Sequence, residues 1–145
     1  MGLDNYIYAR GKNQKGVEFL ERYFNHLKDD YFEDDRYEFS YMRKNWGIRN
    51  EIIRNIFHGE HDWAHDEDWD GHYVFKIAEI EKFVEIFAYF LNEEHWNDDA
   101  NSIWAWHEGI PSIARTIADL RFLEEDTEEE GITDEDIELF FIDSY

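Results

Sequence analysis

Apolar residues recur along this chain with alternately strand-like and helix-like spacing, and this alternation limits the possible folds more than any other feature. Apolar residues at every second position indicate a strand, whereas apolar residues three or four positions apart indicate one face of a helix. Strands are expected at residues 3–9, 36–41, 72–77, 102–107 and 137–145. Helices are expected from Val17 to Leu27, from near Met42 to Phe57, from Ile80 to Leu91, and from Pro111 to Leu123. This order predicts one α+β domain over residues 1–145, with about five strands and four helices packed on a mixed sheet.

The segments between these elements are polar and are expected to form turns and loops. They cover residues 11–16, 29–35, 93–101 and 124–131, the last of which is an acidic run. Thr133 and Asp136 have the spacing of a capping arrangement, and the C-terminal strand is expected to close the sheet. The chain has no cysteine, no N-terminal signal-like segment and no apolar run of about 18 residues. A cytoplasmic protein without a membrane segment is therefore predicted.

The segment from His58 to His72 divides the charge of the chain. It holds six carboxylates, four histidines and two tryptophans, but no Lys or Arg. Residues 1–57 contain ten basic and ten acidic side chains, whereas the remainder contains four basic and twenty-six acidic ones, which leaves a net charge of -22. Such a charge repels nucleic acids and anionic membranes and attracts basic surfaces. With 43% hydrophobic residues the chain is expected to fold, and its acidity either serves a basic partner or only confers solubility.

Three rows of carboxylates are the candidate partner-binding residues, and tryptophans lie inside the first two. Aromatic side chains are common anchors at interfaces, while charges steer association. Double-stranded DNA carries about one negative charge per 1.7 Å of axis, so rows of carboxylates can compete for a DNA-binding groove. We therefore expect a non-enzymatic DNA mimic or anti-defence inhibitor that binds a basic, nucleic-acid-binding host protein. The candidates are Glu60, Asp62, Trp63, Asp66, Asp68, Trp69 and Asp70, then Glu93, Glu94, Trp96, Asp98 and Asp99, and finally Glu128, Glu129 and Glu130.

The alternative hypothesis is a metal-binding module or metal-dependent hydrolase. On a helix, His61 and His65 would share one face, and imidazole and carboxylate ligands suit Zn²⁺ and related ions. Asp62 stands where a zinc protease has glutamate, and Gly59 disfavours a continuous helix. Exposed histidines in an acidic loop are the competing interpretation. The candidate metal ligands are His58, His61, His65, Asp66, Asp68 and Asp70.

The run from Asp66 to Gly71 also resembles the first half of a calcium loop, with oxygen ligands at alternate positions before a glycine. The twelfth position, where such loops have a bidentate glutamate, is Ile77. A solvated acidic loop that runs into a strand explains the same pattern without calcium.

The predicted second helix is basic on one face, with Arg43, Lys44, Arg49 and Arg54. These side chains could hold a phosphate or RNA, but salt bridges to the acidic half of the chain are the favoured interpretation. The neutral N-terminal half could also contact a second copy of the chain. No nucleophile and base pair or phosphate-binding glycine motif stands out.

Three short motifs resemble those of a family of small uncharacterised proteins encoded mainly by bacteriophages. They are Met1-Gly2-Leu3-Asp4 before Tyr6 and Tyr8, the segment Tyr41-Met42-Arg43-Lys44, and the final residues 140–145. The resemblance spans most of the chain in order, although Met42 replaces an aromatic residue and residues 58–70 have no counterpart. It implies a phage accessory protein and a topology, but no activity.

Overall fold

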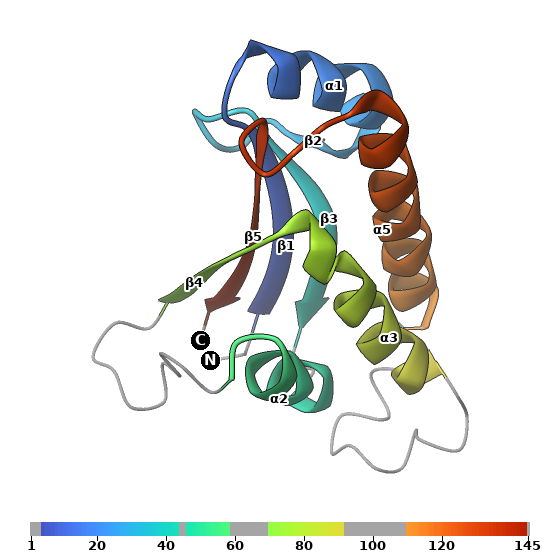
Figure 1. Cartoon of the computed structure of the whole chain (residues 1–145). Helices are drawn as coiled ribbons and strands as arrows, with labels where there is room; N and C mark the ends of the chain where they lie inside the picture. Colours follow the sequence, from blue (N-terminus) through green and yellow to red (C-terminus); the bar gives the residue numbers. More distant parts are fainter. Residues whose placement is uncertain (1–3, 44–45, 59–69, 92–109, 145) are drawn as a thin grey trace.

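The computed structural model describes residues 4–43, 46–58, 70–91 and 110–144. Five strands form one sheet in the order β2-β3-β1-β5-β4 (Figure 1). Every pair of neighbouring strands is antiparallel, so the α+β class is confirmed but the expected mixed sheet is not. The predicted strand at residues 102–107 lies outside the described residues, and the two-residue β2 was not expected. The strands are β1 (Asp4–Gly11), β2 (Lys28–Asp29), β3 (Arg36–Arg43), β4 (Asp70–Phe75) and β5 (Ile137–Ser144).

Helices α3 (Ile80–Leu91) and α5 (Ile110–Glu130) lie side by side over one face of the sheet (Figure 1). Helix α1 (Gln14–Phe24) lies at one end of the sheet and α2 (Trp46–Asn55) at the other. Single 3-10 turns follow α1 at Asn25–Leu27 and precede α3 at Ile77–Glu79. The two helices over this face, α3 and α5, both lie on segments that the sequence pattern predicts to be helical.

The hydrophobic core lies between the sheet and these helices. In β1 the inward positions are Ile7 and Ala9, while Tyr6 and Arg10 lie on the opposite face, as period-two alternation requires. Burial of such side chains is the main favourable contribution to folding. The other core residues include Phe39, Leu139 and Phe141 from the strands and Leu20, Ile52, Phe83, Phe87, Leu120 and Leu123 from the helices.

Strand β3 continues through Arg43, so the expectation of a helix that begins near Met42 is wrong. A β-bulge explains the error. Ile7 pairs with Ser40 but Tyr8 pairs with Glu38, so Phe39 is the extra residue on β3. Both Phe39 and Ser40 are buried, which interrupts the alternation that identifies a strand in sequence. Met42 is a buried strand residue, and α2 begins at Trp46.

Helix α5 extends to Glu130, so the predicted acidic loop at residues 124–131 is largely helical. Its buried face continues through Leu120, Leu123 and Thr127, and glutamate has a good helix propensity. The helix ends in a Schellman motif, in which Gly131 has φ 66°. The Ile132 N–H donates to the Thr127 carbonyl at 2.8 Å, and the Gly131 N–H donates to the Glu128 carbonyl at 3.3 Å.

The Thr133–Asp136 pair closes a turn that leads into β5 and does not begin a helix. The Asp136 carboxylate accepts from the Thr133 N–H at 2.9 Å, and Asn13 donates to the same carboxylate at 2.9 Å. Asn13 also caps α1 by accepting from the Gly16 N–H. A Cβ at Gly16 would lie 1.9 Å from the Asp136 carbonyl oxygen, so glycine permits this close approach.

Strand β5 lies between β1 and β4, and a buried ion pair fixes it to α2. Arg49 donates to Asp143 Oδ2 through Nε at 2.9 Å and Nη2 at 2.8 Å, while Asn5 donates to Asp143 Oδ1 at 2.7 Å. All three side chains are buried. The expectation that Arg49 pairs with the acidic half of the chain is confirmed, whereas Arg54 pairs with Glu51 of its own helix.

Candidate interaction surface

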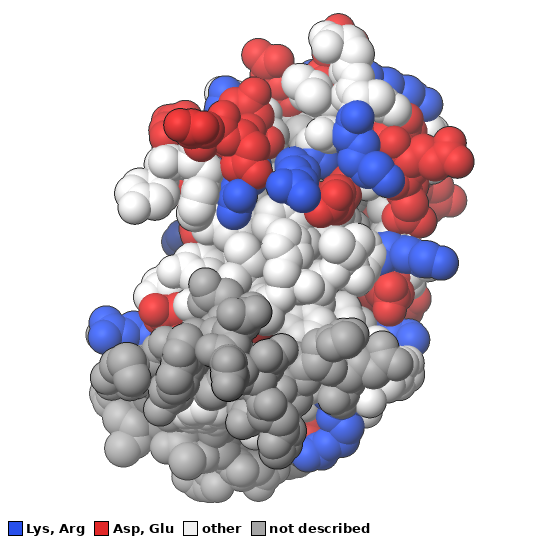
Figure 2. Space-filling model, turned by 90° about the vertical axis from the view of Figure 1, so that its left-hand side faces the viewer, with Lys and Arg blue, Asp and Glu red and all other residues white. Residues whose placement is uncertain are grey.

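No helix of the described residues covers the second face of the sheet, which we call the open face (Figure 1). Figure 2 looks onto this side of the molecule and shows an uncharged centre beneath a belt of acidic and basic side chains. The strand register assigns residues to the open face because cross-strand partners lie on the same side. They are Asp4, Tyr6, Tyr8 and Arg10 in β1, Arg36, Glu38, Tyr41 and Arg43 in β3, Glu138, Phe140 and Ile142 in β5, and His72 and Val74 in β4.

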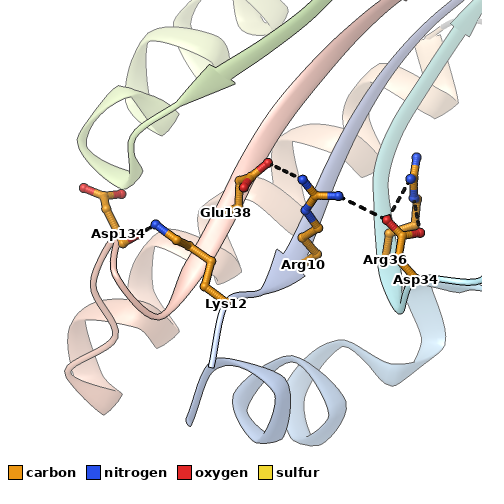
Figure 3. Close-up of polar contacts among 6 residues, drawn as sticks. All are labelled: Arg10, Lys12, Asp34, Arg36, Asp134 and Glu138. Atoms are coloured by element: carbon orange, nitrogen blue, oxygen red, sulfur yellow. Dashed lines mark hydrogen bonds and ion pairs between the residues drawn. The ribbon is translucent and has the colours of Figure 1, made fainter. Parts of the chain in front are cut away.

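Two arginines of the open face form a network with two carboxylates (Figure 3). Arg10 donates to Asp34 Oδ2 at 3.1 Å and to Glu138 Oε1 at 2.7 Å. Arg36 holds Asp34 with two contacts of 2.8 Å, through Nε and Nη2. Hydrogen bonds from Arg36, together with those from Arg10, lower the pKa of the Asp34 carboxyl. Nearby, Lys12 donates to the Asp134 carbonyl oxygen at 3.0 Å.

Aromatic rings lie against the same two guanidinium groups. The Arg36 Cζ lies 3.9 Å from the centroid of Phe32 and 5.1 Å from that of Tyr8. Arg10 lies 5.0 Å from the centroid of Phe140. Phe140 and Tyr8 are thereby almost fully buried although they lie on the open face. These arginines are therefore neutralised and stacked within the protein, which argues against a role in binding phosphate.

Tyr8, Tyr6 and Tyr41 form a row of stacked rings on β1 and β3, next to this network. The centroids of Tyr8 and Tyr6 lie 5.6 Å apart, and those of Tyr6 and Tyr41 lie 5.0 Å apart. Burial and then the charge of Asp4 raise the pKa of Tyr6 to about 12. Tyr41, at the end of the row, is 39% exposed, and its hydroxyl donates to Asp4 Oδ1 at 3.1 Å. The row therefore combines aromatic surface with a carboxylate.

Two further carboxylates adjoin Tyr8. The Tyr8 hydroxyl donates to Asp29 Oδ2 at 3.3 Å. Burial, followed by repulsion from Asp29, raises the pKa of Glu38 above its ordinary value. This side of the open face therefore favours a positive charge.

His72 and His58, the two ends of the segment that divides the charge, line one hollow beside β4. Its volume is about 380 Å³, and Phe57, Tyr73 and Glu79 also line it. The His72 ring stacks on Phe140 at 4.7 Å, and burial followed by the charge of Arg10 lowers the pKa of its imidazole. In the described part of the chain, no three His, Asp or Glu side chains gather to hold a metal ion.

The calcium-loop hypothesis conflicts with the backbone at its glycine. Gly71 lies within β4 and pairs with Asp143 of β5, as Asp70 pairs with Ser144. The strand is extended there, whereas a calcium loop needs a sharp turn at that glycine. His58 is exposed and has φ 55°, so the chain leaves α2 through a left-handed residue. A helical continuation of α2 through His58 is therefore not formed.

Most of the predicted site residues fall on segments whose structure is not described. They are Glu60, His61, Asp62, Trp63, His65, Asp66, Asp68, Trp69, Glu93, Glu94, Trp96, Asp98 and Asp99. Glu128, Glu129 and Glu130 are described, and all three are exposed on the last turn of α5. Glu130 accepts a hydrogen bond from the Tyr23 hydroxyl of α1. Of the candidates that the structure describes, only these three lie together on one element.

The sequence pattern did not predict the tyrosine row or the arginine network. One signal was available, because Tyr6, Tyr8 and Arg10 alternate in the first strand and so lie on one of its faces. The contribution of Phe32 and Tyr41 depends on strand pairing and on a turn, which have no such local signature.

Within the described ranges, no helix has the length and apolar character to span a membrane. Comparison of the chain with family models, curated proteins and solved structures found no match.

Proposed function

We propose that this protein is a non-enzymatic, phage-type interaction protein that binds a basic, nucleic-acid-binding host protein and blocks its nucleic-acid site. The charge density at the end of α5 carries this proposal. Residues 124–130 contain six carboxylates in seven helical positions. At a rise of about 1.5 Å per residue, this is about one negative charge per 1.7 to 1.8 Å. Duplex DNA has about one per 1.7 Å of axis, so a DNA-binding groove meets a comparable charge density.

This cluster destabilises the isolated helix, which supports a role in binding. Acidic side chains near a helix C-terminus oppose the helix dipole. Like charges four residues apart also cost about 0.2 to 0.5 kcal/mol per pair. Burial and the charges of Glu125 and Glu130 accordingly raise the pKa of Asp126. The like-charged pairs are Glu124 with Glu128, Glu125 with Glu129, and Asp126 with Glu130.

In the described part of the chain, two cations lie near this helix end, but neither pairs with Glu128 or Glu129. Lys15 donates to the Gly131 carbonyl oxygen at 2.9 Å, and Lys15 and Arg22 line one hollow with Glu130. Arg10, Arg36 and Arg49 pair with Asp34, Glu138 and Asp143, which lie elsewhere. Among the described residues, Glu128 and Glu129 form no ion pair. The positive charge that balances Glu128 and Glu129 therefore comes from solvent ions or from a partner, and a basic protein supplies it at high local concentration.

The test is capture of host proteins by the immobilised chain after nuclease treatment, at low and at high salt. We expect a basic protein to bind at low salt and to elute at high salt. Adding the chain to that protein should also displace a labelled DNA duplex. Capture that is independent of salt, or a captured protein whose DNA binding is unchanged, would contradict the proposal.

Two triple variants distinguish a specific contribution of the end of α5 to binding from a general effect of net charge. The first variant is Glu128→Gln/Glu129→Gln/Glu130→Gln, which retains the acceptor for the Tyr23 hydroxyl. The control is Glu21→Gln/Glu33→Gln/Glu81→Gln, which removes equal charge from three exposed, separate sites. Surface ion pairs contribute about 0.5 kcal/mol each, so the first variant should weaken the captured complex about tenfold. Equal weakening by both variants would show that the helix end is not the binding site.

A further inference from the structure

The open face carries a second feature that suits a basic partner, at a site distinct from the end of α5. Tyr41 terminates the stacked tyrosine row, and the opposite side of Tyr6 is covered by Tyr8. Tyr41 remains 39% exposed, so part of its ring is accessible. Asp4 lies beside it, and its Oδ1 accepts a hydrogen bond from the Tyr41 hydroxyl at 3.1 Å. Each carboxylate oxygen has two acceptor sites, so Asp4 can accept further donors.

The protein already binds a guanidinium group on the same face with this combination of groups. Arg36 stacks on Phe32 at 3.9 Å and lies 5.1 Å from the centroid of Tyr8. The carboxylate of Asp34 receives two of its donors at 2.8 Å. An aromatic ring with an adjacent carboxylate therefore holds an internal arginine here.

Tyr41 and Asp4 present the same combination toward solvent without an internal arginine between them. Arg43 is the register partner of Asp4, but in the described part of the chain no ion pair joins their side chains. Glu38 and Asp29 lie along the same side of the face and add negative charge. The local field therefore favours a cation next to Tyr41, with Arg43 as the neighbouring competitor.

We propose that Tyr41 and Asp4 form a docking site for an arginine side chain of the basic partner. The guanidinium stacks on the exposed part of the Tyr41 ring and donates to the Asp4 carboxylate. Arginine fits better than lysine because its planar group can stack and donate two parallel hydrogen bonds at once. The inference rests on the proposed function in taking a basic protein as the partner, but it assigns a contact that the end of α5 does not make.

The experiment measures binding of two short glycine-spaced peptides of equal charge to the full chain, one with arginines and the other with lysines. Stacking at an exposed site corresponds to about a two- to fivefold preference for arginine. Tyrosine-labelled protein should show ring-signal shifts for Tyr41 and Tyr6 with the arginine peptide. Equal affinity for both peptides, or no binding of the arginine peptide, would overturn the inference.

Variants identify the groups responsible. Tyr41→Leu should abolish the preference for arginine, whereas Tyr41→Phe retains the ring and should keep it. Asp4→Asn should weaken binding of the arginine peptide, and Arg43→Gln should strengthen it by removing the competing cation. If circular dichroism shows that Tyr41→Leu is unfolded, the Asp4→Asn and Arg43→Gln variants still test the docking site. The proposal requires that Asp4→Asn weakens binding of the arginine peptide and that Arg43→Gln strengthens it.

The end of α5 provides the control that separates the two proposals. The Glu128→Gln/Glu129→Gln/Glu130→Gln variant should lower the affinity of both peptides alike and leave the arginine preference unchanged. A preference that survives in Tyr41→Leu overturns the docking site but leaves the proposed function intact. Salt-independent binding of host protein contradicts the proposed function regardless of the peptide result. A Tyr41→Leu change that only dissociates a dimer would assign the surface to a second copy and also overturn the inference.

Discussion

The buried pair of Arg49 and Asp143 offers the sharpest test of how this fold is held together. Arg49 retains 5% side-chain exposure and Asp143 none, and two hydrogen bonds of 2.8 and 2.9 Å join them. Removing one partner from a buried ion pair leaves an uncompensated charge and costs about 3 to 5 kcal/mol. A domain of this kind has a total stability of about 5 to 15 kcal/mol. Arg49→Met should therefore remove a large part of the free energy of unfolding.

The companion substitution is Asp143→Asn, whose side-chain oxygen can still accept from Asn5, as Asp143 does at 2.7 Å. It leaves Arg49 buried and charged, so its expected cost is also about 3 to 5 kcal/mol. The double variant contains no buried charge at this position and retains the acceptor for Asn5. Its cost should be smaller than the sum of the single costs by about 2 kcal/mol or more.

Urea unfolding followed by tryptophan fluorescence and far-UV circular dichroism would measure these free energies. For a chain of this size, about 3 °C of melting temperature corresponds to 1 kcal/mol, so each single variant should melt about 10 °C lower. Additive costs for the two substitutions, or a loss below about 1 kcal/mol for Arg49→Met, would refute the claim that this pair fixes α2 to the sheet.

Three further expectations concern single side chains. The pKa of Asp34 is lowered in the folded state, so the carboxylate stabilises the fold above its unfolded pKa, and this contribution is lost as pH falls through the folded pKa. The difference in melting temperature between wild type and Asp34→Asn should therefore shrink in acid. A difference that is independent of pH would contradict this. The pKa of Glu38 is raised, so its ionised carboxylate destabilises the folded state at neutral pH. Glu38→Gln should therefore raise the melting temperature at neutral pH but not in acid. No stabilisation at pH 7 would count against burial as the cause of the raised pKa. Gly131 has φ 66°, and no atom lies within 4 Å of an added Cβ. Gly131→Ala should therefore lower the free energy of unfolding by about 1 kcal/mol through backbone strain alone, and Gly131→Asn should lower it less. Equal stability of wild type and both variants would exclude strain.

Much of the fold could be predicted because its signals are local. The alternation in β1 and the spacing of Ile80, Phe83 and Phe87 in α3 identify one strand and one helix without reference to other segments. The extension of β3 was missed because the bulge at Phe39 breaks the alternation. The extension of α5 was missed because its acidic run masked the buried stripe that continues to Thr127.

The candidate site was predicted only in part. The exposed acidic end at Glu128 to Glu130 was visible as composition, although its helical form, which sets its charge density, was not expected. The docking site depends on Tyr6 of β1 stacking on Tyr41 of β3, and the arginine network joins Arg10, Asp34 and Glu138 across three segments. No spacing within any one segment indicates these contacts.

The sequence by itself therefore determined the types of most elements, the α+β class and the unequal distribution of charge, because local periodicity and composition decide these properties. Tertiary structure alone decided that β5 lies between β1 and β4, that Asp143 meets Arg49, and that no helix of the described residues covers the open face. The physical reason is that strand order and register depend on which distant surfaces bury each other best. The same pairing that buries the core places Tyr6, Tyr41 and Asp4 together on the opposite side.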